Sequence, residues 1–181
     1  DARAESQARR NVGVLFDDNR LNDETARLLR KLAEQQREDG AWPWFPGGPA
    51  NEYITLYITT GFGRLRHLGA DLDVAAAVKS LTRLDAWIDE TYREILKQDE
   101  KNKDKIHLST TIALYLYGRS FFLQDQPVGD AHREAVQYFL GQARQYWLDL
   151  GNRQSQAHLA VALKRFGDRD TPQAIMQSIK E

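Results

Sequence analysis

The chain contains no cysteine and only one methionine among its 181 residues. The lack of cysteine excludes disulfides, thiolate zinc sites and a cysteine nucleophile. Four histidines are scattered along the chain, and none forms an HExxH-like pair that would place two metal ligands on one helical face. They are His67, His107, His132 and His158. We therefore expect neither a metal nor an organic cofactor.

The chain also lacks an excess of either charge and any long apolar run. Its 25 Lys and Arg residues nearly balance its 26 Asp and Glu residues, for a net charge of −1. We therefore expect no nucleic-acid partner, and without an apolar run of about 18 residues we expect no membrane span. Residues 1–5 include neither an initiator methionine nor an apolar signal core. This start predicts that residues 1–181 form one helical domain excised from a much larger protein.

Apolar residues recur at helical spacing along the chain, whereas alternating strand patterns are absent. The pattern predicts an all-α protein of about eight helices. The expected segments are 4–16, 22–38, 51–69, 73–96, 108–122, 130–150, 152–167 and a last helix that begins at Thr171-Pro172. The expected N-caps are Asn22, Asn51, Asn152, Thr171 and either Asp71 or Asp73.

Glycines mark the ends of three of these segments, and two more lie inside a helix. Gly69, Gly151 and Gly167 are expected to terminate helices, because glycine adopts the left-handed conformation of a C-cap. Gly61 and Gly63 interrupt the segment 51–69, where each costs about 1 kcal/mol relative to alanine. We expect close approach of another helix to compensate for them.

Three segments are apolar around much of their circumference, and each follows a more amphipathic one. They are residues 53–69, 108–122 and 155–167. An alternation of inner and outer helices in antiparallel hairpins is typical of an α/α toroid, although an antiparallel solenoid that serves as a scaffold for partner proteins would show it too. The predicted fold is a partial α/α toroid. Its open edge is expected either to dimerise or to be closed by the terminal helices.

Residues 39–48 are unlike a generic helical protein. They read Asp-Gly-Ala-Trp-Pro-Trp-Phe-Pro-Gly-Gly, and Tyr53 follows at the start of the next helix. The two prolines fix φ and favour extended neighbours, while glycines allow backbone angles that side chains forbid. We expect residues 39–48, here the aromatic loop, to form a stiff structural or recognition loop whose rings pack back over the helix ends. The candidate residues are Trp42, Pro43, Trp44, Phe45, Pro46, Gly47, Gly48 and Tyr53.

Residues 39–48 and 53–63 resemble the entry to a helical hairpin in the thioester-domain region of bacterial alpha-2-macroglobulins. These are large protease-trapping proteins related to complement components, and the domain is an α/α toroid similar to that of terpenoid cyclases and prenyltransferases. The rest of the chain agrees only as a succession of helices. The resemblance implies a non-enzymatic structural and recognition domain in a protease trap.

The defining chemistry of this family is a Cys-Xaa-Glu-Gln thioester that acylates attacking proteases. The motif does not occur here; in relatives it lies upstream of the aromatic loop, and some bacterial members lack it. No catalytic residue is therefore carried over. The resemblance implies an extracytoplasmic location, in the periplasm or cell envelope. It implies neighbouring domains of the parent chain as partners and proteases as the targets of the parent protein.

A carbohydrate-active or carbohydrate-binding α/α barrel is the alternative function. Trp42, Trp44 and Tyr53 would then be sugar-stacking platforms, and carboxylates between Asp85 and Glu94 would be the acid and base. The same carboxylates share one helix with basic residues at ion-pair spacing, which favours a solvated face. A glycan ligand would quench tryptophan fluorescence, whereas a structural loop would not respond.

Overall fold

The computed structural model describes residues 18–98 and 104–180, which form two units, one ending at Gln36 and one beginning at Arg37. The first unit contains α2 (Asp18–Gln35), which carries an exposed ion pair between Arg27 and Glu24. The helix starts four residues before Asn22, so the expected N-cap at Asn22 is wrong. The helix expected over residues 4–16 lies outside the described residues.

The described residues of the second unit, 37–98 and 104–180, contain six further α-helices and two short 3₁₀ helices. They are α3 (Glu52–His67), α4 (Ala75–Gln98), α5 (Thr110–Arg119), η2 (Ser120–Phe122), α6 (Asp130–Tyr146), η3 (Trp147–Leu150), α7 (Arg153–Arg165) and α8 (Asp170–Lys180). Residues 18–98 and 104–180 thus hold seven α-helices and no strand, which confirms the all-α class with about one helix fewer than expected. None of these helices is long and apolar enough to cross a bilayer.

Local sequence signals account for most of the helix ends. The side chains of Asn51, Ser109 and Asn152 accept hydrogen bonds from the backbone of the helices that follow. Asp73 bonds the first residue of α4 in the same way, with an Oδ1–N distance of 2.8 Å. The glycines expected to end three helices all have positive φ; they are Gly69, Gly151 and Gly167. For α8 the cap is Asp168, which bonds two backbone N–H groups, rather than Thr171.

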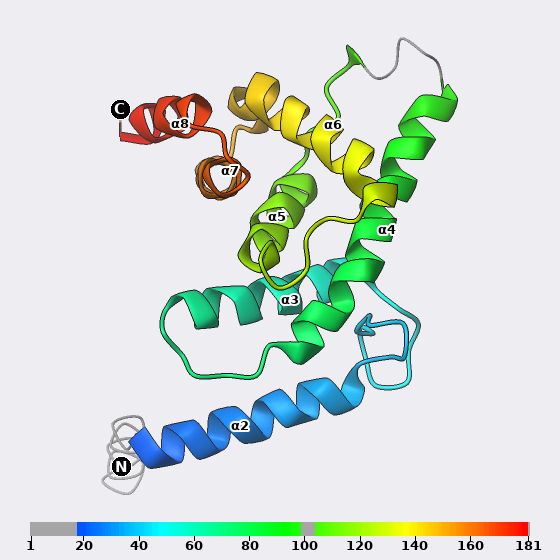
Figure 1. Ribbon diagram of the computed structural model, residues 1–181, viewed down its shortest axis with the longest axis vertical. Helices are drawn as coiled ribbons and strands as arrows, with labels where there is room; N and C mark the ends of the chain where they lie inside the picture. Colours follow the sequence, from blue (N-terminus) through cyan, green and yellow to red (C-terminus); the bar gives the residue numbers. More distant parts are fainter. Residues whose placement is uncertain (1–17, 99–103, 181) are drawn as a thin grey trace, which may run out of the picture. The chain divides into compact units, whose positions relative to one another are not determined.

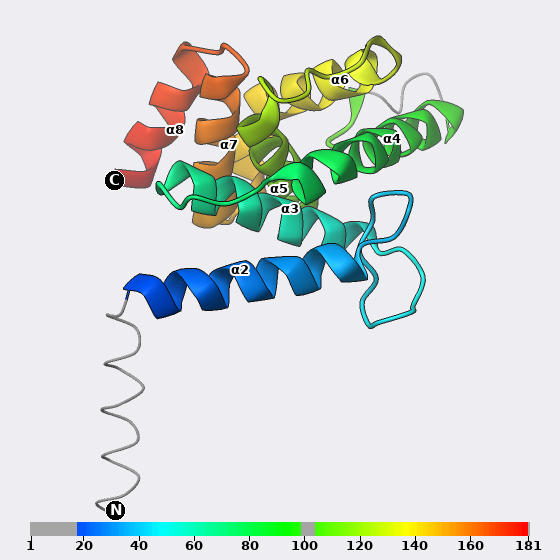
Figure 2. The same cartoon turned by 60° about the horizontal axis from the view of Figure 1, so that its bottom comes forward.

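The helices of the second unit form two rows (Figure 1). In one row α5 lies between α3 and α7, and in the other α4 packs against α6, while α8 packs against α7. Figure 2 shows α3, α5 and α7 grouped in the same order from a second direction. The three segments expected to be inner helices thus lie side by side in one row.

Contacts between neighbouring helices show whether the helices of a row run parallel or antiparallel. Between α3 and α5, the gap above Gly118 is filled by Thr60, and one turn further on the gap above Gly63 is filled by Phe121. From the first contact to the second, the residue number rises by three on α3 (60 to 63) and by three on the segment of α5 and η2 (118 to 121). The two helices α3 and α5 therefore run parallel. The same reasoning applies to α5 and α7, in which Tyr117 stacks on His158 and Ser120 bonds Arg165.

The core is centred on α5, as its nearly continuous apolar sequence predicts. Ile112, Ala113 and Leu116 are all at most 4% exposed, and the core continues into the neighbouring helices of both rows. A helix that is apolar on most sides must be covered on most sides. Its position between α3 and α7, with α4 and α6 of the other row against a further side, satisfies that requirement.

Gly63→Ala is expected to destabilise the protein, and Gly61→Ala to stabilise it. A Cβ at Gly63 would lie 2.6 Å from Cγ of Phe121, whereas a Cβ at Gly61 would meet nothing within 4 Å. The clash at residue 63 should cost about 1–3 kcal/mol, and the better helix propensity at residue 61 should gain up to about 1 kcal/mol. Urea denaturation measures both. Shifts of equal sign would contradict the close approach of α3 to Phe121.

Candidate functional site

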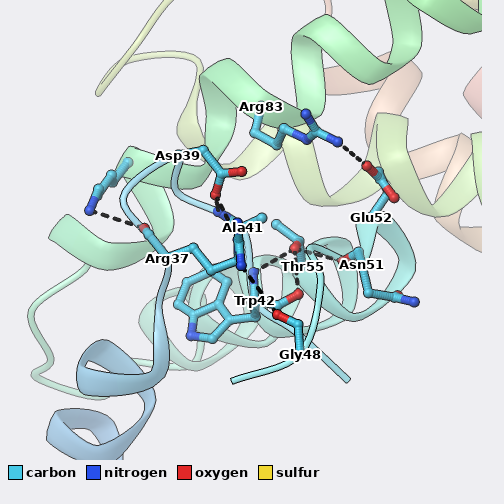
Figure 3. A network of polar contacts seen from close by, with 10 residues as sticks. Arg37, Asp39, Ala41, Trp42, Gly48, Asn51, Glu52, Thr55 and Arg83 are labelled. Atoms are coloured by element: carbon cyan, nitrogen blue, oxygen red, sulfur yellow. Dashed lines mark hydrogen bonds and ion pairs between the residues drawn. The ribbon is translucent and has the colours of Figure 1, made fainter. Parts of the chain in front are cut away.

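The aromatic loop is anchored to α3 through Trp42 (Figure 3). The backbone N–H of Trp42 donates to Oγ1 of Thr55 at 2.8 Å, and its carbonyl accepts from the N–H of Asn51 at 3.0 Å. The Thr55 hydroxyl in turn donates to the carbonyl of Asn51 at 2.7 Å. The indole is 1% exposed and stacks on Phe62, with ring centroids 6.4 Å apart. Trp42 is therefore a structural anchor.

Polar contacts close the base of the loop, also visible in Figure 3. The guanidinium of Arg37 donates to the carbonyl of Gly48 at 3.2 Å, and the backbone N–H of Arg37 donates to the carbonyl of Ala41 at 2.9 Å. Oδ1 of Asp39 accepts from the N–H of Ala41 at 3.1 Å. These bonds join both arms of the loop, so side-chain and backbone contacts among residues 37–48 hold its shape.

The loop also approaches α4 closely at Gly40. This residue has φ of +83°, and a Cβ there would lie 2.5 Å from the carbonyl oxygen of Lys79. Only glycine combines that φ with that separation. The side chain of Lys79 completes the contact by donating to the carbonyl of Arg37 at 3.3 Å. An ion pair between Glu52 and Arg83 links α3 and α4 beside the loop.

The tip of the loop points into solvent. Trp44 is 68% exposed and Phe45 is 58% exposed, between the half-buried Pro43 and the exposed Pro46. The expectation that the rings pack back over the helix ends is therefore right for Trp42 and wrong for Trp44 and Phe45. The chain bends at Trp44 and Phe45, just beyond the isolated bridge between Pro43 and Ala50, and this bend separates the anchor from the tip.

The other candidate residues of the loop have distinct positions. Gly47 is exposed with φ of +76°, Gly48 is buried under the ring of Phe45, and Tyr53 is exposed on the first turn of α3. Tyr53 lines a groove along α3. Trp44 is not among the residues that line this groove.

The carboxylates of α4 do not form one solvated face. Asp85 is 2% exposed, so the surface interpretation is wrong for this residue. It is wrong also for Asp89, which is only 9% exposed although it pairs with the exposed Arg93, and it holds for Glu94, which pairs with Lys97 at the surface. The acid and base expected of a glycosidase would include a carboxylate that reaches substrate, and Asp85 is enclosed in the core.

Asp85 forms a bidentate ion pair with Arg119 of α5. Nε of Arg119 lies 2.9 Å from Oδ1 and Nη2 lies 3.2 Å from Oδ2, and Nη2 also donates to the carbonyl of Gln126 at 2.7 Å. The hydroxyl of Tyr115 donates to Oδ1 at 2.7 Å. Burial, reinforced by the charge of Asp85, raises the pKa of Tyr115 well above its ordinary value, so the hydroxyl remains a donor.

The histidines lie on separate elements. Within residues 18–98 and 104–180, no three side chains of the His, Cys, Asp and Glu types gather as metal ligands would. His158 stacks on Tyr117 with centroids 4.3 Å apart, and burial, followed by the charge of Arg64, lowers its pKa. It lines the same groove as Tyr53. Sequence reasoning missed this groove, because its walls come from α3, α5 and α7, which are distant in sequence.

The described residues thus present a loop with two exposed rings, and a groove along α3. Comparison of the chain with protein-family models, with curated proteins and with solved structures found no match.

Proposed function

We propose that this chain is part of the helical, thioester-domain-like region of a bacterial alpha-2-macroglobulin-like protease trap, where it is a structural and recognition domain and not an enzyme. The observation that carries the proposal is the aromatic loop. The residues that resemble the family form a loop clamped by hydrogen bonds, which exposes Trp44 and Phe45. A preorganised loop loses little conformational entropy on binding. It is suited to docking against a neighbouring domain of the parent chain.

The helix arrangement supports the expectation that the fold is a partial α/α toroid. The inner row α3, α5 and α7 runs parallel, and contacts of α4 with α6 indicate the same for the outer row: Asp89 lies beside His132, and Tyr92 beside Tyr138. Successive helices thus alternate between two rows, as a toroid requires. The extracytoplasmic location follows from the resemblance and is part of the same proposal.

The first experiment is to sequence the parent gene on both sides of this segment. We expect strand-rich sandwich domains in the flanks, with a Cys-Xaa-Glu-Gln motif upstream if the trap is covalent. Strand-rich flanks without the motif would indicate a trap that acts by shape alone. Flanks without such domains would overturn the family proposal.

The second experiment tests trapping with the purified parent protein and trypsin. A trap should block cleavage of a large protein substrate and spare a small peptide substrate. A variant with Trp44→Ala and Phe45→Ala should weaken trapping by about fivefold or more, since exposed aromatic residues dominate many interfaces. Leu148→Ala, which truncates an equally exposed residue on η3, is the matched control. A parent protein that leaves cleavage of the large substrate unchanged is not a trap.

The carbohydrate alternative loses two of its supports in this structure. Trp42 is buried beneath the loop and Asp85 is paired in the core, so neither reaches a sugar ring. Trp44 and Tyr53 remain exposed. Titration with soluble oligosaccharides distinguishes the two functions, because stacking of a sugar on Trp44 would quench its fluorescence. A response that Trp44→Ala abolishes would favour carbohydrate binding.

A further inference from the structure

The groove along α3, here the α3 groove, has a volume of about 540 Å³. Its floor is one face of α3, from Tyr53 through Tyr57 to Leu68, and its far wall is formed by the first turns of α5 and α7. Tyr53, Tyr57 and Leu68 are all more than half exposed. The groove lies wholly within the second unit and is separate from the tip of the aromatic loop.

The α3 groove contains one charged side chain, that of Arg64. Its lining includes no aspartate or glutamate. Arg64 is exposed, and none of the ion pairs among the described residues involves it. The other arginine of this turn, Arg66, is held by Asp125 at 2.7 Å on another side of α3. Arg64 thus has a free guanidinium beside an apolar surface.

His158 lies close enough to Arg64 for the charge of the guanidinium to act on its imidazole. It comes from α7, stacks on Tyr117 of α5 and faces Arg64 of α3. Burial and the charge of Arg64 both lower its pKa, so the neutral imidazole is favoured. A carboxylate bound beside Arg64 would remove part of that effect.

The dimensions favour an extended chain over a small ion. From Tyr53 to Leu68 the helix advances by about 22 Å, a span covered by about seven residues of extended peptide. Tyrosine rings supply large, rigid contact surfaces for apolar side chains. Hydroxyl and amide groups of α5 and α7 line the other side and can bond a peptide backbone; they belong to Thr110, Thr111, Asn152, Gln154 and Ser155.

We propose that the α3 groove binds an extended acidic peptide segment of a partner protein. A carboxylate of the segment pairs with Arg64, and apolar side chains lie against Tyr53 and Tyr57. This inference does not rest on the proposed function, because it follows from the shape and charge of the groove alone. The protein as a whole carries a net charge of −1, so a general electrostatic attraction does not account for such binding.

The test measures binding of a labelled heptapeptide, Glu-Tyr-Glu-Leu-Glu-Phe-Glu with blocked ends, to the full chain by fluorescence anisotropy. We expect binding that weakens with added salt, and at least tenfold weaker binding of the counterpart with lysine in place of glutamate. Arg64→Glu should reduce affinity about tenfold or more, and Arg64→Lys should retain most of it. Arg169→Glu makes the same charge change outside the groove lining and should change affinity less than twofold.

Two further readouts locate the peptide. Tyr57→Ala, at an exposed position, should weaken binding without loss of helicity in circular dichroism. Nuclear magnetic resonance should show that the peptide raises the pKa of His158, since a nearby carboxylate favours the protonated form. Equal binding of the two peptides, equal losses in Arg64→Glu and Arg169→Glu, or an unchanged His158 would each overturn the proposal. Free glutamate that binds as tightly as the peptide would overturn it in favour of a small-anion site.

Discussion

Arg119→Ala is expected to lower the free energy of unfolding by about 3–5 kcal/mol, because it leaves the carboxylate of Asp85 buried without its partner. The two side chains are 0% and 2% exposed, so water cannot replace the guanidinium. The substitution also removes the donor to the carbonyl of Gln126. The loss is a large share of the ~5–15 kcal/mol that stabilises a typical domain. Urea denaturation followed by circular dichroism measures it.

Two comparisons show that burial, rather than ion pairing as such, sets this effect. Lys97→Ala removes a partner from the exposed Glu94 and should cost no more than about 0.5 kcal/mol. Replacing the whole network by apolar residues, with Asp85→Leu, Tyr115→Phe and Arg119→Met, should be less destabilising than Arg119→Ala, because no buried charge remains. If Arg119→Ala cost no more than Lys97→Ala, the enclosed ion pair would be refuted.

Trp42→Ala is expected to cost about 3–5 kcal/mol, the range for a fully buried large aromatic residue. The substitution opens a cavity beside Phe62, against which the indole is stacked. The backbone bonds from Trp42 to Thr55 and Asn51 remain possible. We therefore expect a destabilised but folded protein, measured by urea denaturation with circular dichroism.

Trp44→Ala is the matched control, two residues away on the same loop. Its side chain is exposed, so the change in unfolding free energy should stay within about 0.5 kcal/mol. Acrylamide should quench Trp44 readily and Trp42 hardly at all. Equal destabilisation by the two substitutions would show that the loop buries both rings, contrary to this structure.

Much of the secondary structure could be predicted because its signals are local. An asparagine cap acts on the residues directly after it, as at Asn51 and Asn152, and a glycine such as Gly69 ends a helix by its own φ. The start of α2 was misplaced because Asn22, a good cap in isolation, lies inside a pattern that continues towards the N-terminus.

The site was only partly predictable. Prolines and glycines indicated a loop between two helices, which the structure contains. The anchor Trp42 and the tip residue Trp44 are of the same type and differ only in what surrounds them, so the sequence did not distinguish them. Likewise, the spacing of Asp85 on α4 was compatible with a surface pair along its own helix. Its true partner, Arg119, is 34 residues away.

By itself the sequence determined that the chain is helical, where most helices end, and that residues 39–48 form a loop, because these features depend on backbone preferences within a few residues. Only the tertiary structure decided which rings and charges are buried, that Gly63 and not Gly61 accommodates a neighbouring side chain, and that Tyr53, Arg64 and His158 line one groove. Burial and pairing depend on residues brought together from distant helices. Their energies are settled by desolvation and packing, which a local pattern does not contain.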